Sequence, residues 1–472
     1  MAAAVQPTDP TKPRVPPIAL VAVLALIPAL HAVILLGRIH PDEVYQALEP
    51  AFWRATGGTG VLAWEWQTGL RNWATPLVLS AFLKLSLLLH LDNPRAYRVV
   101  LELPQYALHL ASLMAVYRFA LRRLGKGSEG WAVLASALVG LHGLTIIFAG
   151  RTMSESFSAS FLLLAVEALD RSFFEGENEK RAGLLGGLYL GLSVVARYGS
   201  GVVVVALMVY LLGARKFRTF LFAAISGVVV ALALGLLDFI TWNEWFHSLR
   251  AYLQFNVLSG QAAQQFGQSP WSFYVPWFFR ELPFWFWLGM PVAFFKLKPK
   301  LSAPLFGGAL YLLAIFATPH KEERFLYPGL LLLAMAAAPG VAWLGRALRA
   351  QKRIGYALAA VALVVGLAPL QYSDWPELRA DQTRAIVYAT RGDATGLLIV
   401  NEGVWGAGGF FYIGRNIPWG VCDFGTEPRF IGAMRDPRIN RAVTFEDRAI
   451  PELTAAGFHE IAKIGRETVF AR

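Results

Sequence analysis

Three short stretches of this 472-residue sequence carry ionisable and aromatic side chains in patterns that could perform chemistry. The first is His40-Pro-Asp-Glu-Val-Tyr-Gln46, where the carboxylates of Asp42 and Glu43 directly follow an apolar segment. An unpaired charge is costly to bury at a membrane boundary, so both carboxylates need water or a partner. Either could accept a proton as a general base. A solvated helix start, acidic in its first turn, is the simpler alternative.

The second stretch, Thr318-Pro-His-Lys-Glu-Glu-Arg-Phe325, places five ionisable residues in a row between two apolar segments. Gly, Ser or Asn would be enough for a plain connection. His320, Lys321 and Arg324 at a helix start suit an anionic phosphate, because Arg binds phosphate bidentately while Lys and the helix N-terminus stabilise its charge. The stretch therefore predicts a phosphate-binding site.

The third stretch is Trp64-Glu65-Trp66-Gln67, followed by Arg71-Asn72. Tryptophan is favoured at membrane interfaces, so these rings need no substrate to explain them. A glutamate between two tryptophans is less expected of such a belt, and sugar-binding sites often pair aromatic faces with carboxylates. The pattern of Trp64, Glu65 and Trp66 therefore fits both an interfacial belt and a sugar-binding site.

The elements that must position these stretches are membrane helices. The chain is 56% hydrophobic and 16% charged, with a mean hydropathy of +0.47, whereas soluble proteins are about 25% charged. Apolar blocks of roughly 15 to 22 residues, long enough to cross a bilayer, recur about eleven times. The predicted spans are 17–37, 98–121, 131–149, 152–171, 183–198, 200–214, 217–237, 274–295, 302–317, 325–345 and 354–371.

The net charge of +11 does not indicate nucleic acid here, because the Lys and Arg residues form short clusters between apolar blocks, as topology determinants do. With a cytoplasmic N-terminus, five basic loops fall inside together, and the C-terminus lies outside. The clusters are Arg122/Arg123/Lys126, Lys180/Arg181, Arg215/Lys216/Arg218, Lys296/Lys298/Lys300 and Arg346/Arg349/Lys352/Arg353. One miscounted span would reverse every later loop, so this agreement supports the count.

The opposite face carries the three stretches, in the first outer loop 38–97 and the connection 318–324. Within the first loop, 75–91 is expected to form an interfacial or re-entrant helix. Further ionisable residues converge on the same leaflet: Glu102, Arg151, Glu155, Arg197, Asp238, Arg280 and Glu281. Charged residues inside membrane segments are functional candidates by default.

Three parts of the chain are expected: a cytoplasmic tail (1–16), a transmembrane catalytic domain (17–371) and an extracytoplasmic α/β domain (372–472). Strands are predicted at 397–400, 410–413, 442–445 and 468–470, with helices near 375–391 and 450–456. The single cysteine, Cys422, excludes an internal disulfide and any cysteine-based metal cluster.

In their order along 17–345, these stretches resemble the family 22 glycosyltransferases, which are α-mannosyltransferases using polyprenyl- or dolichyl-phosphate-mannose. The other matching segments are Arg151-Thr-Met-Ser154, Asp238 to Phe255-Asn256, and Gly267, Pro270-Trp271 and Tyr274. The first loop is closest to the branch that adds the third mannose of GPI anchors. Departures occur at Glu155, Phe157 and Asn72, and they bear on acceptor contacts. Abundant Ala, Gly and Arg favour a bacterial source.

The resemblance implies a GT-C fold and inverting transfer of mannose from a polyprenyl-phosphate donor to a glycan or glycolipid hydroxyl. Asp42 is assigned as the base, with Glu43 as positioner or alternate base, and the phosphate leaves toward His320, Lys321 and Arg324. Sugar or acceptor contacts are assigned to Trp64, Glu65, Trp66, Arg71, Arg151 and Asn256. No cofactor and no metal is expected, although a divalent ion bridging Asp42 and the phosphate is the alternative.

The expected location is the bacterial inner membrane, or the endoplasmic reticulum of a eukaryote, with the site on the periplasmic or luminal face. The expected partners are the lipid-linked donor, the acceptor and membrane lipid, with no nucleic acid, and the expected state is a monomer. Two alternatives remain open: the same fold with another polyprenyl-phosphate sugar, and a transporter or flippase of lipid-linked sugars. A transporter often shows internal repeats and polar groups at the bilayer midplane, and neither is evident.

Overall fold

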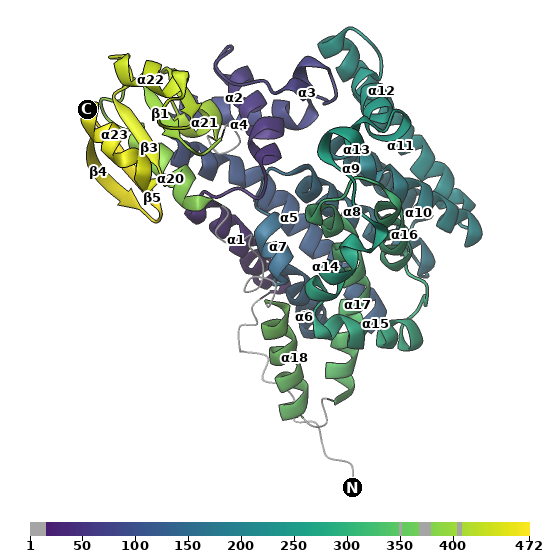
Figure 1. Ribbon diagram of the computed structural model, residues 1–472. Coiled ribbons are helices and arrows are strands. Elements are labelled where there is room, and N and C mark those ends of the chain that lie inside the picture. The colour runs from purple at the N-terminus through teal and green to yellow at the C-terminus, as the bar shows by residue number, and fades with distance from the viewer. Residues whose placement is uncertain (1–15, 349–351, 368–378, 404–407) are drawn as a thin grey trace.

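The computed structural model describes residues 16–348, 352–367, 379–403 and 408–472. They form a helical body and a small C-terminal lobe that contains a sheet (Figure 1). Residues 1–15 of the expected tail (1–16), the start of the predicted helix 375–391 and the predicted domain boundary near residue 371 lie outside the described residues.

The helical body runs through helices of very different length. In chain order they are α1 (Pro17–Leu35), the π-helix η1 (Glu43–Leu48), α2 (Glu49–Ala55), α3 (Trp64–Gln67), α4 (Ala74–Leu88), α5 (Pro94–Leu124), α6 (Glu129–Gly140), α7 (Gly143–Phe148), α8 (Ser154–Asp170), α9 (Glu179–Ala196), α10 (Gly201–Gly213), α11 (Phe217–Trp242), α12 (His247–Leu253), the π-helix η4 (Gln254–Leu258), α13 (Gln261–Phe266), α14 (Tyr274–Glu281), α15 (Phe284–Lys296), α16 (Ala303–Ala317), η6 (Glu323–Leu326), α17 (Tyr327–Ala347) and α18 (Lys352–Gly366).

Four helices of the described chain are long and apolar enough to cross a membrane: α1, α5, α11 and the run Glu323–Ala347. The other predicted spans correspond to shorter or divided helices, so the count of about eleven stays a prediction. Two of the predicted spans, 131–149 and 274–295, are each divided between two helices. His142 begins a new helix by accepting a hydrogen bond from the Leu144 amide, and Pro283 separates α14 from α15 because proline supplies no N–H to a continuing helix.

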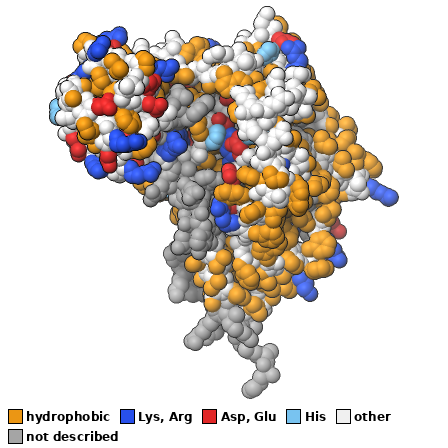
Figure 2. Space-filling model, in the orientation of Figure 1, with side chains coloured by type: hydrophobic (Ala, Val, Ile, Leu, Met, Phe, Trp, Pro, Cys, Tyr) orange, Lys and Arg blue, Asp and Glu red, His pale blue; other side chains and the backbone are white. Residues whose placement is uncertain are grey.

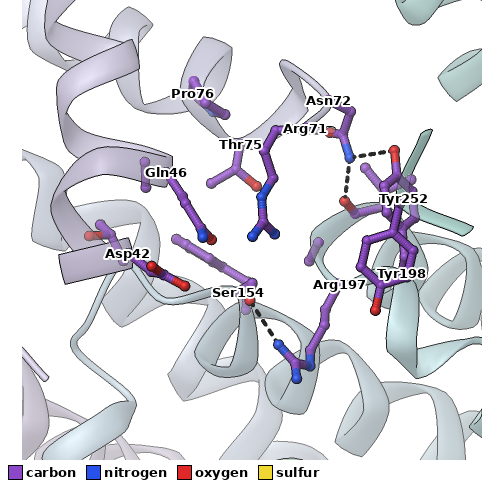
Figure 3. A pocket seen from close by; sticks show the side chains of 15 residues that line it. Asp42, Gln46, Arg71, Asn72, Thr75, Pro76, Ser154, Arg197, Tyr198 and Tyr252 are labelled. Carbon is purple, nitrogen blue, oxygen red and sulfur yellow. Dashed lines mark hydrogen bonds between the residues drawn. The ribbon is translucent and has the colours of Figure 1, made fainter. Parts of the chain in front are cut away.

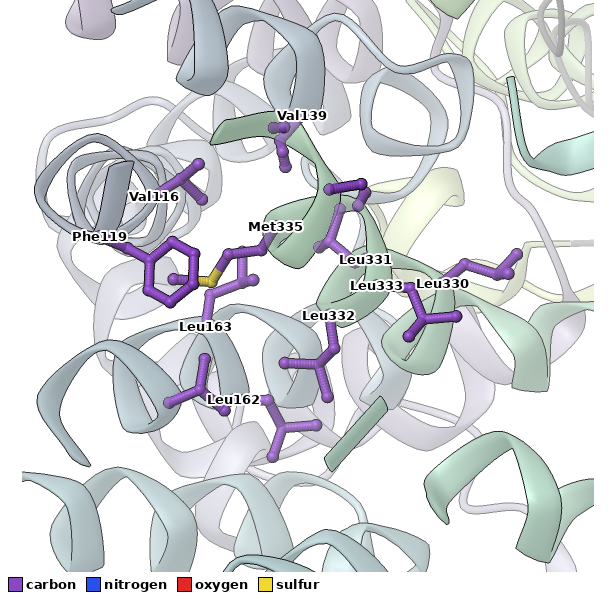
Figure 4. Close-up of a cluster of buried hydrophobic side chains, with 14 of the residues drawn as sticks. Val116, Phe119, Val139, Leu162, Leu163, Leu330, Leu331, Leu332, Leu333 and Met335 are labelled. Atoms are coloured by element: carbon purple, nitrogen blue, oxygen red, sulfur yellow. The ribbon is translucent and has the colours of Figure 1, made fainter. Parts of the chain in front are cut away.

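The core of the body lies where α5, α8 and α17 meet (Figure 4). Phe119, Leu162 and Leu332 are completely buried there. Glycines let neighbouring helices approach: a Cβ added at Gly340 of α17 would stand 2.0 Å from the Gly289 carbonyl of α15. Small residues at such crossings are typical of helix packing in membranes.

The predicted basic loops lie at one end of the helical body. Hydrogen bonds and ion pairs connect them in a chain: Arg346 to Ser128 (2.6 Å), Arg123 to Asp170 (2.6 Å), Lys216 to Glu179 (2.8 Å) and Tyr210 to the Leu301 carbonyl (2.8 Å). The loops that carry the three stretches meet at the opposite end, where α2, α3, α4 and α12 lie in Figure 1. Helix α5, with 31 residues, separates the two ends by roughly 45 Å.

The C-terminal lobe contains a five-stranded sheet in the order β2-β1-β3-β5-β4, made of β1 (Leu397–Val400), β2 (Trp419–Cys422), β3 (Arg441–Thr444), β4 (His459–Ile464) and β5 (Glu467–Ala471). Strand β1 pairs in parallel with β2 and β3, whereas β5 pairs antiparallel with β3 and β4. Its helices are α20 (Ala380–Ala389), α21 (Gly409–Ile413), α22 (Pro428–Arg435) and α23 (Ile450–Ala455).

Three of the four predicted strands are confirmed, at β1, β3 and β5. The prediction of a strand at 410–413 is wrong, since this segment forms the helix α21. Gly408 precedes this helix with a φ of +74°, and Gly409 begins it with a φ of +63°. This left-handed backbone turns the chain into the helix, whereas an extended strand would need negative φ. Strands β2 and β4 were missed.

The lobe shares its hydrophobic core with the first outer loop. One cluster joins Val44, Leu48 and Phe52 of η1 and α2 to Phe411 of α21 and Ile399 of β1. One face of the sheet is therefore packed on the segment that begins at His40, whereas Leu398 and Val400 of β1 belong to a second cluster made of lobe residues alone.

Candidate active site

An open cavity, whose empty space of about 600 Å³ includes solvent at its mouth, lies between the first outer loop, the start of α8, the end of α9 and α12 (Figure 3). Its lining includes Asp42 and Gln46 from the η1 segment, Arg71, Asn72 and Thr75 from the connection into α4, Thr152, Ser154 and Phe157 from the start of α8, Arg197 and Tyr198 after α9, and Tyr252 of α12. Five stretches far apart in sequence thus line one polar space. On the surface, acidic, basic and histidine side chains gather in a groove between the lobe and the helical body, while hydrophobic side chains cover the lower part (Figure 2).

Asp42 stands where two of the three stretches meet. Its Oδ2 pairs with Arg324 Nη2 at 2.8 Å, and its Oδ1 lies 3.1 Å from His40 Nδ1. Burial alone would raise the pKa of Asp42, but the Arg324 guanidinium and the His40 ring outweigh burial and hold that pKa well below its ordinary value. The structure therefore brings Asp42, the predicted base, against Arg324, a predicted phosphate ligand.

Glu322 organises the predicted phosphate-binding stretch. It receives a hydrogen bond from Arg324 Nε at 2.5 Å, and His320 Nε2 lies 3.0 Å from its second oxygen. Although burial raises the pKa of Glu322, Arg324 and His320 lower it to about 2. Lys321 donates to the Thr318 carbonyl and lies over the Tyr274 ring at 5.9 Å. His320, Lys321 and Arg324 thus share one short turn, as the sequence predicts.

A second guanidinium, Arg197, enters the cavity from the break between α9 and α10. Its Nη1 donates to Glu155 at 2.7 Å and to Ser154 at 3.2 Å. Glu155 is completely buried and also faces Arg324 at 3.9 Å. Glu155 therefore links Arg197, which lines the cavity, to the pair formed by Arg324 and Asp42.

Glu43 and Arg151 lie behind the cavity and are completely buried. Glu43 accepts the Ile39 amide at 3.1 Å and lies 3.9 Å from both Arg98 and Arg151. Arg151 donates to the Gly37 carbonyl. Neither is among the described residues that line the cavity, so the structure assigns them to the support of the segment that carries Asp42.

Of the predicted sugar contacts, one lines the cavity and the others lie outside its lining. Arg71 lines the cavity and pairs with Glu65 at 2.6 Å. Trp64 packs on Phe255 with ring centroids 5.3 Å apart. Trp66 is 3% exposed and donates its indole N–H to the Tyr45 carbonyl, so it is a core residue.

Asn256 is exposed on η4, donates to the Tyr252 carbonyl and is not among the described residues that line the cavity. Sequence reasoning missed Gln46, Asn72, Tyr198 and Tyr252 as lining residues. Asn72 donates to the Tyr198 hydroxyl and to the Val195 carbonyl, both at 3.0 Å. The break at Arg197-Tyr198-Gly199 was a usable signal, while nothing in the local pattern marks Tyr252.

Within the described ranges no group of three or more His, Cys, Asp or Glu side chains could hold a metal ion.

Comparison with known proteins bears on this arrangement directly. Residues 18–373 match the sequence pattern of the Alg9-like mannosyltransferase family. This chain belongs to that family. The matched range contains the cavity and all of the residues that line it.

Among similar curated proteins, this family member is 32% identical to GPI mannosyltransferase 3 of Yarrowia lipolytica, over 69% of this chain and 62% of the relative. It is 25% identical to GPI alpha-1,2-mannosyltransferase 3 of Danio rerio, over 64% of this chain and 55% of the relative. The chain thus spans about 60% of the length of the curated relatives it matches.

Among solved structures, the fold resembles ArnT from Cupriavidus metallidurans bound to undecaprenyl phosphate, with a TM-score of 0.62 and 12% identity over 96% of this chain and 97% of that chain. It also resembles the arabinofuranosyltransferase AftD from Mycobacteria, with a TM-score of 0.53 and 16% identity over 96% of this chain and 39% of that chain. The expected GT-C fold is confirmed.

Proposed function

We propose that this chain transfers mannose from a polyprenyl-phosphate carrier to a hydroxyl of a glycan or glycolipid, with inversion at the anomeric carbon. The observation that carries the proposal is the 2.8 Å pair between Asp42 and Arg324 at the edge of the cavity. It joins a carboxylate that can accept a proton to a guanidinium that can bind phosphate. Both groups are needed for a glycosyl transfer in which phosphate leaves.

In the proposed reaction the acceptor oxygen attacks the anomeric carbon of the sugar as its proton passes to Asp42. The carbon–oxygen bond to phosphate breaks, and its electron pair leaves on the phosphate oxygen. The products are an α-mannoside and polyprenyl phosphate. A phosphate is a good leaving group, so the reaction requires no general acid and no covalent intermediate.

Arg324 couples the two halves of this reaction. Without donor it is shared between Asp42 and Glu322. An incoming phosphate competes for the guanidinium, and phosphate suits its planar fork. Each contact that Arg324 gives up with Asp42 makes this carboxylate a stronger base, so donor binding activates the base. His320 and Lys321 add donors and charge on the same side.

The cavity supports an acceptor on the side away from Arg324. Arg71, Asn72 and Tyr198 supply donors and acceptors suited to sugar hydroxyls, and the Tyr252 ring supplies an apolar face. The similarity to GPI mannosyltransferase 3 and GPI alpha-1,2-mannosyltransferase 3 supports a glycolipid acceptor.

We place the site on the extracytoplasmic or luminal face, because the five basic loops gather at the opposite end of the helical body and such loops favour the cytoplasm. The C-terminus then lies outside. The carrier chain would run between helices that open to lipid, beside the aromatic segment 270–295. This topology is testable by labelling cysteines introduced at Lys180 and at Glu460 in sealed vesicles whose outer surface is the extracytoplasmic face, where only Glu460→Cys should react with an impermeant reagent added outside.

The reaction is tested with purified protein in detergent, a short-chain polyprenyl-phosphate-mannose and a panel of mannose-containing glycolipids. Release of polyprenyl phosphate together with a new α-mannoside, equal with and without EDTA, is the expected result. Parallel donors carrying glucose or arabinose decide whether mannose is the donor sugar. Absence of turnover with every pair, or full turnover by Asp42→Asn, contradicts the proposal.

A further inference from the structure

Helix α21 of the C-terminal lobe lies outside the family match, which ends at residue 373, yet it contacts the segment that carries Asp42. It packs on η1, α2, α5 and α20. Of these, η1 and α2 directly follow Asp42 in the chain. The lobe therefore reaches the candidate active site through one short helix.

Glu49 makes the central contact. It is completely buried at the start of α2. Its Oε1 accepts the Phe411 amide at 2.6 Å, and its Oε2 accepts the Val61 amide at 2.7 Å. The carboxylate thus holds together α2, the loop before α3 and α21.

Gly409 allows this contact to form. Its φ is +63°, and a Cβ at this position would lie 2.3 Å from Glu49 Cδ. Any other residue would therefore need both an unfavourable backbone conformation and space that the Glu49 side chain occupies.

Aromatic packing extends the contact to α5. The Phe411 ring lies 6.3 Å from Phe52 and 5.4 Å from Tyr97, both nearly edge to face. Such pairs add about 0.5–1.5 kcal/mol beyond their buried area. Tyr412 next to it is completely buried, and the charges of Arg98, Glu43 and Arg151 act on its hydroxyl. These are the groups that support the Asp42 segment from behind.

We infer that α21 is a positioning element of the active site, which holds the η1 and α2 segment so that Asp42 faces the cavity. The inference rests on the proposed function of Asp42 as the base. It assigns to the lobe a part in catalysis: the helical body supplies the reacting groups, and the lobe fixes one of them in place.

The position of Asp42 and the binding of phosphate can be tested separately, because α21 contacts only the side of the site that carries Asp42. His320, Lys321 and Arg324 belong to the connection between α16 and α17, whereas α21 contacts the first outer loop. Weakening the α21 contact should therefore lower kcat and leave the affinity for polyprenyl phosphate, the product that occupies the phosphate side, unchanged. A general loss of structure would lower both.

The test compares Gly409→Ala with Gly392→Ala in the full-length protein. Gly392 is the matched control: its φ is +65°, but a Cβ there meets no atom within 4 Å. We expect Gly409→Ala to lower kcat by about 10- to 100-fold, the effect of misplacing a reacting group by about 1 Å. Gly392→Ala should retain the wild-type kcat, and both variants should bind short-chain polyprenyl phosphate as wild type does. Tyr412→Phe, which removes only a hydroxyl, serves if Gly409→Ala fails to fold, with a smaller loss of kcat expected.

Hydrogen exchange across residues 40–62 provides a readout that needs no turnover. Exchange there should be faster in Gly409→Ala than in Gly392→Ala. Equal exchange and equal kcat in the two variants would overturn the inference, as would a parallel loss of polyprenyl phosphate affinity. If wild type shows no turnover, the proposed function fails by itself, and faster exchange without turnover would leave α21 with a structural role only, which also overturns the inference.

Discussion

Two clusters of buried charges lie at opposite ends of the helical body, and they are built differently. The basal cluster consists of Arg122, Arg123, Glu167, Asp170 and Arg171. Arg123 meets both oxygens of Asp170 at 2.6 Å, and its guanidinium lies 3.6 Å from the centre of the Phe119 ring. Arg122 and Arg171 both pair with Glu167.

The cavity cluster consists of Asp42, Glu155, Arg197, Glu322 and Arg324. Here one guanidinium, Arg324, is divided among three carboxylates at 2.8, 2.5 and 3.9 Å. Two members of the cluster, Asp42 and Arg197, line the cavity.

This difference indicates different roles. In the basal cluster, Arg123 already donates to both oxygens of Asp170 and is covered by the Phe119 ring, so it has no donor directed at a new ligand. This pair joins α5 to α8. A divided guanidinium beside an open space can exchange one carboxylate for a phosphate at little cost. Under the proposed function, the same residue types therefore join two helices at one end of the body and bind phosphate at the other.

Removing the carboxylate at the cavity should give the largest effect on activity. Asp42→Asn keeps the shape of the side chain but cannot accept the acceptor's proton, and general-base catalysis contributes about 10²- to 10⁴-fold. We expect kcat to fall by that factor. Binding of polyprenyl phosphate, measured by titration, should not weaken, since Arg324 is released from its pair. A kcat within twofold of wild type would assign the base to another residue.

Breaking the basal cluster should affect stability instead. Asp170→Asn leaves Arg123 buried without its partner, which costs about 3–5 kcal/mol. The unfolding midpoint in detergent should fall, while turnover by the folded fraction at low temperature stays at the wild-type level. The matched control is the double variant Arg123→Met with Asp170→Leu, which removes both charges and should recover most of the stability. A loss of kcat in folded Asp170→Asn would contradict a purely structural role for this ion pair.

The pH profile tests the division of Arg324. Arg324 and His40 hold the pKa of Asp42 below its ordinary value against the effect of burial, so this carboxylate stays ionised at pH 5 and kcat/KM should have no acid limb from it. In Arg324→Gln the guanidinium no longer offsets the effect of burial, so the pKa of Asp42 should rise to or above its ordinary value, and an acid limb should appear. Its position, and not the overall loss of rate, is the diagnostic result. Glu322→Gln leaves Arg324 beside Asp42 and should keep the wild-type shape.

Much of this arrangement is predictable from single stretches of sequence. The acidic residues after the first apolar segment and the basic turn before Phe325 were each identifiable by residue type. The positive charge of the other loops predicted that both stretches lie at the opposite end of the helical body. That Arg324 pairs with Asp42 was not predictable, because the contact depends on how the η6 turn lies against the residues just before η1.

Other errors come from segments too short to show a period. The run Phe410–Ile413 fits a strand and a helix equally well, and the decision depends on the positive φ of Gly408 and Gly409. In Trp64-Glu65-Trp66 the pattern predicts that both tryptophan rings contact a sugar. On the four-residue helix α3 one ring faces Phe255, and the other is buried with Trp73 at 4.6 Å. Which ring faces which side is set by the tertiary packing of the loop.

The smallest expected effect concerns Glu49, the carboxylate that joins the lobe to the first loop. Burial raises its pKa from 4.5 to about 7, although the amides of Phe411 and Val61 favour the ionised form. Between pH 4.5 and 7 the native protein therefore holds a proton that the unfolded chain has lost, so stability falls as the pH rises through this range and is constant above it. The unfolding midpoint should be lower at pH 8 than at pH 5. Glu49→Gln should reduce this difference, whereas Glu460→Gln, at an exposed position of the lobe, should not. An unchanged difference in Glu49→Gln would mean that Glu49 is ionised throughout and that its two amide partners outweigh its burial.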